Sequence, residues 1–128
     1  MNTEAIAEIL EIPEAKVASS AREMSSAISL TRGLVSAEEL VVAREISVGS
    51  LRTNMSSADI DAFLGWNLRL ERMLTLDKRL IERADLRQEL LWHFRRMPHR
   101  LKDLVKRKIA EVRALEDKQQ EQKKNPDP

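Results

Sequence analysis

The fold is decided by one stretch, residues 57–118, whose sequence is SADIDAFLGWNLRLERMLTLDKRLIERADLRQELLWHFRRMPHRLKDLVKRKIAEVRALEDK. When its residues are placed at 100° intervals, most apolar side chains of the first two-thirds fall on one broad helical face. They are Ile60, Phe63, Trp66, Leu70, Met73, Leu74, Leu80, Ile81, Ala84, Leu91 and Trp92. This pattern predicts helical structure that buries the apolar face.

Residues 58–97 are compatible with two arrangements. One straight helix would be about 60 Å long at 1.5 Å per residue, whereas a compact chain of this length has a radius of gyration of about 14 Å. Asp77 lies within the apolar face, where an unpaired charge is costly, and Asp is a common N-cap. We therefore favour a break at residues 75–77 and two packed helices over one continuous rod that a partner would cover.

The second half of this region carries apolar residues on the opposite side as well, namely Leu86, Leu90, Phe94 and Met97. This part should be covered on two sides, either by the N-terminal helices and the last helix or by another subunit. Pro98 removes a backbone donor and disfavours helical geometry at the residue before it, so a kink is expected there. The last helix is expected over residues 98–120, and a disordered tail over residues 122–128.

The N-terminal residues 1–49 predict short helices. The expected segments are 3–10, 13–32 with Gly33 just past the end, and 36–47, which begins with a Ser36-Ala37-Glu38-Glu39 capping box. The predicted fold is therefore all-α, a small bundle of about five to six helices with a long, kinked C-terminal helical hairpin or rod. Residues 1–121 are expected to form a single domain.

The composition agrees with an all-α fold and excludes some classes of function. The 128 residues include 34% charged side chains but three Gly, four Pro, no Cys and 3% aromatic residues. Few turn and strand formers favour an all-α fold. The absence of Cys excludes disulfides and thiolate chemistry. No apolar run approaches about 18 residues and the first residues are acidic, so we expect a cytoplasmic protein that does not associate with membranes.

Positive charge is concentrated towards the C-terminal end. Residues 1–50 hold eight acids and four bases, whereas residues 93–128 hold eleven bases and six acids. Seven fixed cations lie within residues 93–108. The residues of this region that we expect to bind a partner or nucleic acid are Arg95, Arg96, His99, Arg100, Lys102, Lys106, Arg107 and Lys108. The alternative is a solvated face whose charges pair with acids of the N-terminal helices.

Residues 6–24 carry a second functional pattern, which begins with IAEILEIPEAKV and continues to Arg22. The pattern resembles the helix-turn-helix in the promoter-reading region of sigma factors, which implies a support helix, a turn and a DNA-recognition helix. Glu11 stands at the turn position usually occupied by Gly, and the second helix has only Lys16 and Arg22 as bases. The alternative is two structural helices joined at Pro13.

Catalytic chemistry finds little support in the sequence. His93 and His99 are the only histidines, and Asp85, Glu89 and His93 are spaced by four rather than by the three residues of helical carboxylate–metal sites. No phosphate-binding loop or nucleophile motif is present. We therefore expect no enzymatic activity, cofactor, metal or small-molecule substrate.

The leading functional hypothesis is a non-enzymatic protein-interaction protein (adaptor, chaperone or assembly component) that forms a homo-oligomer or packs its helices on a larger protein. Its expected interface anchors are Trp66, Leu90, Trp92 and Phe94. The alternative hypothesis is a nucleic-acid-binding regulator or viral DNA-packaging accessory that uses residues 93–108, with or without the helix-turn-helix. A third option is an inhibitor that occupies the nucleic-acid site of another protein through its acidic N-terminal face.

Overall fold

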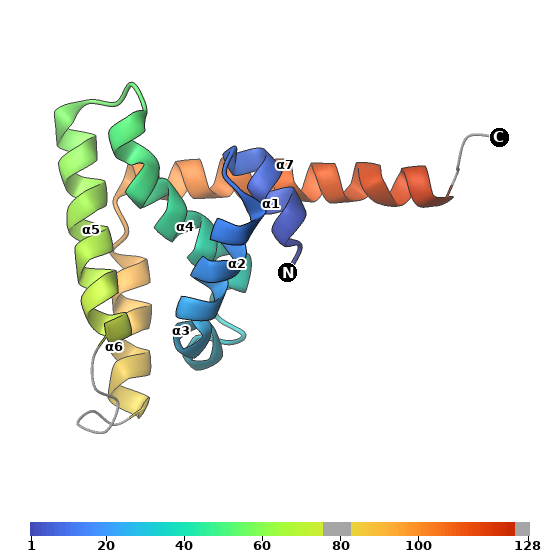
Figure 1. Ribbon diagram of the computed structural model, residues 1–128. Helices are drawn as coiled ribbons and strands as arrows, with labels where there is room; N and C mark the ends of the chain where they lie inside the picture. The colour runs from blue at the N-terminus through green and yellow to red at the C-terminus, as the bar shows by residue number, and fades with distance from the viewer. Residues whose placement is uncertain (76–82, 125–128) are drawn as a thin grey trace.

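The computed structural model describes residues 1–75 and 83–124, and every regular element in them is helical (Figure 1). The elements are α1 (Thr3–Leu10), α2 (Glu14–Glu23), α3 (Ser25–Leu30), α4 (Ala37–Gly49), the 3₁₀ turn η1 (Ser50–Arg52), α5 (Ser57–Thr75), α6 (Arg83–Arg95) and α7 (His99–Lys124). The predicted all-α bundle is confirmed. Seven α-helices are described rather than five to six, because the segment expected over residues 13–32 is two helices. None of them is long and apolar enough to span a membrane.

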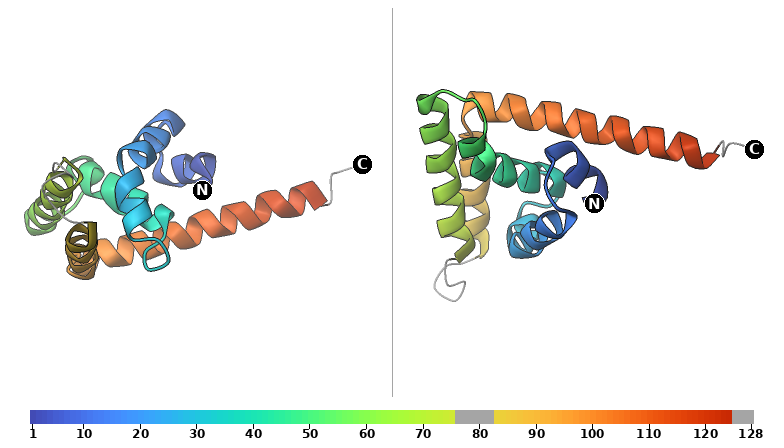
Figure 2. Two further views of the ribbon diagram at one scale, coloured as in Figure 1. Left: turned by 90° about the horizontal axis from the view of Figure 1, so that it is seen from below. Right: turned by 45° about the horizontal axis from the view of Figure 1, so that its top comes forward.

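α5 and α6 lie side by side as an antiparallel pair, and α7 leaves the end of α6 in a different direction and packs across α4 and α1 (Figures 1 and 2). The turn occurs at Pro98, where the predicted kink is confirmed. The backbone N–H of Lys102 bonds to the Pro98 carbonyl at 3.0 Å, which starts the new helix. The last turns of α7 extend past the rest of the molecule (Figure 2).

α5 and α6 are two packed helices and not parts of one straight rod. Trp66 and His93 are 27 positions apart and in direct contact, whereas a straight helix would separate them by about 40 Å. The preferred two-helix arrangement is confirmed. α5 ends at Thr75, and Asp77 lies outside the described residues.

α6 is covered on two sides within the chain, by α5 and by α3. Leu86, Leu90 and Phe94 are consequently buried, and Met97 is half-buried against the same core. The N-terminal helices therefore provide the second cover that the two-sided apolar pattern required, without another subunit.

Local signals at the N-terminal helices explain where they begin and end. Asn2 Oδ1 accepts from the Ala5 N–H at 3.0 Å and Ser36 Oγ from the Glu39 N–H at 3.1 Å, so both side chains are N-caps. The helix expected over residues 13–32 breaks at fully buried Met24, which is followed by Ser25 and Ser26, residues that compete with the backbone for hydrogen bonds. At the other end of the chain, α7 continues to Lys124, three residues into the expected tail.

The core is a single cluster drawn from every α-helix. Its largest fully buried side chains include Phe63 from α5, Ile6 from α1, Leu40 from α4, Leu90 from α6 and Leu101 from α7. α7 shares this core as far as Val112, its last buried side chain, and half-buried Leu115, so its final turns are not anchored by apolar contacts with the core.

Candidate functional site

The eight basic residues singled out from the sequence do not form one surface. Three of them, Arg95, Lys102 and Lys106, line a groove between α6 and α7. Arg100 and Lys108 line a second groove on another side of α7. Arg96 lines a smaller pocket between α5 and α6, and His99 and Arg107 are exposed outside these hollows. The structure therefore divides the cluster among several faces.

The first of these hollows, here the α6–α7 groove, has a volume of about 430 Å³. The apolar residues that line it, here called its floor, come from both helices and the α3–α4 connection: Leu34, Val35, Leu91, Phe94, Met97, Val105 and Ile109. The charged residues that line it, here called its rim, are Arg95, Lys102, Lys106 and Glu39. This combination of an open apolar floor and a charged rim suits an amphipathic ligand.

Two turns build the groove. Gly33 adopts φ +86°, a left-handed conformation that glycine takes without a Cβ penalty. The N–H groups of Leu34 and Val35 then return to the Thr31 carbonyl at 3.0 and 3.1 Å. Leu34 is left 60% exposed at the edge of the groove. On the opposite side, Lys102 Nζ donates to the Arg95 carbonyl oxygen at 2.9 Å across the Pro98 turn.

The rim of the α6–α7 groove carries unbalanced positive charge. Arg95, Lys102 and Lys106 make no ion pair with any residue of 1–75 or 83–124, and Glu39 makes none either. Three cations and one carboxylate leave a net charge of 3 − 1 = +2. The alternative prediction was that acids of the N-terminal helices pair with these bases. Among the described residues, no such pair forms at this groove.

The second groove, of about 460 Å³ between α1, α4 and α7, differs in that some of its bases form ion pairs. Arg100 pairs with Asp59 of α5 at 3.3 Å, and Lys108 pairs with Glu111 at 3.3 Å. Glu11 and Glu45 also line this groove. Lys16 and Arg52 line it as well, so two of its four bases, Arg100 and Lys108, are held in ion pairs.

The pocket between α5 and α6 contains the exposed Trp92, whose ring lies 4.9 Å from the guanidinium carbon of Arg96. Of the four residues expected to anchor an interface, Trp92 is the one with a large free surface, at 55% exposure. Trp66, Leu90 and Phe94 are buried in the core of this chain. Trp92 therefore offers a partner the largest surface of the four, and Phe94 contributes only the 7% that lines the α6–α7 groove.

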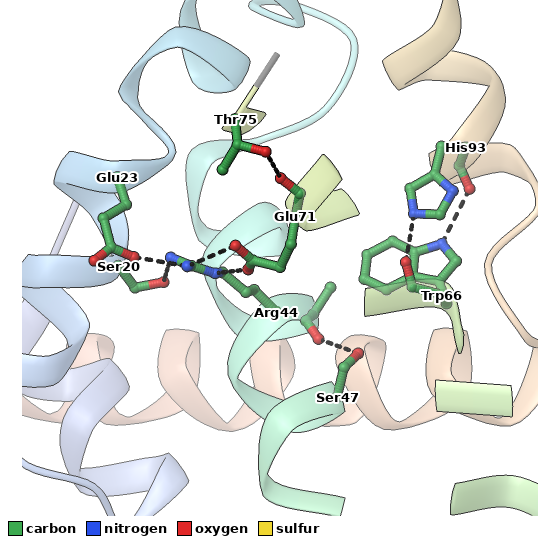
Figure 3. A network of polar contacts seen from close by, with 9 residues as sticks. Ser20, Glu23, Arg44, Ser47, Trp66, Glu71, Thr75 and His93 are labelled. Carbon is green, nitrogen blue, oxygen red and sulfur yellow. Dashed lines mark hydrogen bonds and ion pairs between the residues drawn. The ribbon is translucent and has the colours of Figure 1, made fainter. Parts of the chain in front are cut away.

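Trp66 and His93 fasten α5 to α6 (Figure 3). The rings stack at 4.6 Å between centroids, the Trp66 indole N–H donates to the His93 carbonyl at 3.1 Å, and His93 Nε2 lies 2.9 Å from the Trp66 carbonyl. A carbonyl oxygen only accepts, so Nε2 carries the proton. Burial lowers the pKa of His93 to about 4, although the hydrogen bond to Trp66 opposes this shift, and the nearby charge of Arg69 lowers the pKa further. His93, which belongs to the basic segment in sequence, is therefore neutral at pH 7.

Arg44 joins three helices at the centre of Figure 3. Its guanidinium contacts Glu71 of α5 at 2.7 Å, Glu23 of α2 at 2.6 Å and Ser20 Oγ at 3.2 Å. Burial opposes the charge, but the hydrogen bonds with Glu71 and Glu23 outweigh it and raise the pKa of Arg44. Because its hydrogen bonds and ion pairs join elements of the fold, we assign this network a structural role.

The helix-turn-helix pattern forms two helices joined at Glu11, which has φ 56° and is the only non-glycine residue with positive φ among those described. Its N–H and that of Ile12 return to the Ala7 carbonyl, which closes α1. Pro13 then stands at the N-cap of α2. The left-handed turn is thus present without the usual Gly. The exposed surface of α2 mixes acids with bases, namely Glu14, Lys16, Arg22 and Glu23.

Metal-binding groups do not converge in the parts of the chain that the structure covers, since no three His, Asp or Glu side chains there could share an ion. No family model, curated protein or solved structure matches this chain.

Sequence reasoning identified the cations of the α6–α7 groove but missed Leu34, Val35, Glu39 and Ile109 as partners in one site. Nothing local indicated that residues 34–39 would reach α7.

Proposed function

We propose that this chain is a non-enzymatic interaction protein, of the adaptor, chaperone or assembly type, that binds a partner protein through the α6–α7 groove. The proposal is carried by one observation, the apolar floor bordered by Arg95, Lys102 and Lys106 without ion pairs to any described residue. Covering an apolar floor is favourable because it removes apolar surface from water. Unpaired cations around it attract and orient an anionic partner.

Nucleic acid is the second candidate ligand, because Arg96 and Arg107 are exposed and Arg107 makes no ion pair with the described residues. A phosphate backbone is best matched by cations along one face. Here the cations are divided between two grooves and a pocket on different sides of α6 and α7. Protein binding is the better fit, because the apolar floor has no counterpart in a phosphate backbone.

A non-catalytic role is supported by the state of the two histidines. His93 has its Nε2 engaged by the Trp66 carbonyl inside the fold, and exposed His99 faces Asp103 at 3.8 Å. Neither arrangement places a histidine beside a nucleophile in a cavity, as general base catalysis requires.

A site-specific photo-crosslinker tests the proposal. A benzoylphenylalanine placed at Leu34, on the groove, is compared in the native host with one at Leu68, which is 64% exposed on α5 but lines none of the hollows described above. The proposal predicts a discrete protein adduct at position 34, identified by mass spectrometry, that is absent at position 68. Adducts that do not differ between the two positions, or adducts with nucleic acid alone, would count against it.

A further inference from the structure

We propose that the occupant of the α6–α7 groove is an acidic amphipathic α-helix of another protein. This inference rests on the proposed function and adds to it the conformation and the charge of the partner segment. It follows from the walls of the groove, the charge on its rim and the distribution of acidic helices in this chain.

The walls favour a helical occupant over an extended one. They are formed by α6, α7 and the turn at Gly33. Within a helix the backbone N–H and C=O groups bond to each other, so the two helices leave few backbone groups free to pair with a bound peptide. An extended peptide needs a sheet edge to pair its backbone, and the described residues contain no strand. Over an apolar floor its unpaired amides would be costly. A helix satisfies its own backbone and presents apolar side chains at i, i+3, i+4 and i+7.

The polyproline mode of recognition fits less well. Proline-rich peptides bind between exposed aromatic rings. The α6–α7 groove has one aromatic residue, Phe94, and only 7% of that residue is exposed. Its floor is otherwise aliphatic or thioether, which suits Leu, Ile or Met side chains from a helix.

The rim favours an acidic occupant. Arg95 and Lys106 are exposed, and with Lys102 they outnumber Glu39. None of the three forms an ion pair with the described residues, whereas Arg100 and Lys108 of the second groove pair with Asp59 and Glu111. Carboxylates on the flanks of a docked helix would complete ion pairs that the described chain leaves unmade. The same charges would repel a basic amphipathic helix, which gives the groove its selectivity.

The described helices of this chain do not supply such a segment to a second copy. The most acidic of them are α1, with Glu4 and Glu8, and α4, with three acids and one base. Their apolar faces are already used, since Ile6 of α1 and Leu40 of α4 are fully buried. A second copy could therefore offer the carboxylates of these helices without apolar anchors. A different protein is the better occupant.

The test is an unbiased selection. A phage-displayed library of random 16-residue peptides is selected on the full chain. Each enriched peptide is then measured against the wild type, the doubly reversed variant Arg95→Glu/Lys106→Glu, and the control Arg107→Glu. Arg107 is exposed on α7, next to Lys106 in sequence. It makes no ion pair with the described residues and does not line the groove.

The expected peptides carry net negative charge and apolar residues at helical spacing, and become helical by circular dichroism when bound. The doubly reversed variant should bind them about tenfold more weakly, and Arg107→Glu within about twofold of the wild type. Neutral or basic peptides, extended peptides, a failure to enrich any peptide, or equal losses in both variants would overturn the inference. If the crosslinker at Leu34 still captures a partner in that case, the proposed function stands and only the helical, acidic occupant is wrong.

Discussion

Trp66 and His93 bind each other through both side chains and both backbones. The indole N–H donates to the His93 carbonyl at 3.1 Å, and His93 Nε2 reaches the Trp66 carbonyl at 2.9 Å while the two rings stack. This pair holds α5 beside α6, and α6 in turn forms one wall of the α6–α7 groove. The stability of the site is therefore tied to a contact on the opposite side of α6.

Replacing Trp66 by Phe removes the indole donor and keeps an aromatic ring. The His93 carbonyl retains the Arg96 N–H at 3.2 Å, so it is not left without a partner. Because the smaller ring also leaves buried space beside His93, we expect a loss of about 2 kcal/mol in the free energy of unfolding, measured by urea denaturation. The matched control is Trp92→Phe, which changes an exposed ring and should cost less than about 0.5 kcal/mol. Equal losses in the two variants would show that the buried hydrogen bond contributes nothing.

His93 should make stability fall in mildly acidic solution. Its pKa is lowered in the fold to about 4, so the unfolded chain, with a pKa near 6.5, takes up the proton first as the pH falls. Above pH 6.5 the protonation of His93 does not change the free energy of unfolding. Between pH 6.5 and 4 it lowers the free energy of unfolding by an amount that grows to about 3 kcal/mol.

The pH effect is isolated by comparing the wild type with His93→Gln, whose amide can donate to the Trp66 carbonyl but does not titrate. Carboxylate titration is common to both proteins, so it cancels in the difference. The free energy of unfolding of the wild type should fall more steeply than that of the variant over this range. Parallel curves would mean that His93 titrates normally.

Arg44 should be more sensitive to replacement than other arginines of the N-terminal half. Arg44→Met leaves Glu71 and Glu23 without their shared cation, and because Glu23 is largely exposed we expect a loss of about 2 kcal/mol in the free energy of unfolding. Arg44→Lys keeps the charge but not the paired N–H geometry, and should lose about 1 kcal/mol. Arg22→Met, which alters an exposed arginine of α2, is the control and should be near neutral. A neutral Arg44→Met would contradict a role in joining α2, α4 and α5.

Gly33 and Gly65 predict opposite effects of the same substitution. A Cβ at either residue would meet no atom within 4 Å, so sterics with neighbours do not decide the outcome. Gly33→Ala forces alanine to φ +86° and should destabilise by about 1 kcal/mol. Gly65→Ala lies inside α5 and should stabilise by about 1 kcal/mol. Thermal unfolding of both variants measures the contrast, and a change of the same sign in both would refute the assigned backbone roles.

Much of the fold could be predicted from the sequence because helical periodicity and breakers act locally. The Ser36 cap, the kink at Pro98 and the two-helix arrangement of α5 and α6 all follow from nearby residues. Arg44 was not anticipated, since nothing near it in sequence distinguishes a cation that meets two distant carboxylates from a solvated one.

The candidate site was predicted less completely for a related reason. Lys102, Arg107 and Lys108 are close in sequence, but successive residues of a helix are rotated by about 100°, so neighbours face different surroundings. Which of them borders an apolar floor depends on where the Gly33 turn packs, and that is a tertiary property. The sequence therefore indicated a single basic cluster, whereas the structure has cations distributed around α7.

The central claim, that the α6–α7 groove binds a partner protein, is tested most directly by the affinity of the partner captured at position 34 for two matched variants. Leu34→Asp places a carboxylate on the groove, and Leu68→Asp places one on an equally exposed part of α5. Isothermal titration should show binding weakened at least about tenfold by Leu34→Asp, through lost apolar burial and repulsion of an anionic partner, and unchanged by Leu68→Asp. Equal affinities for the two variants would contradict the account.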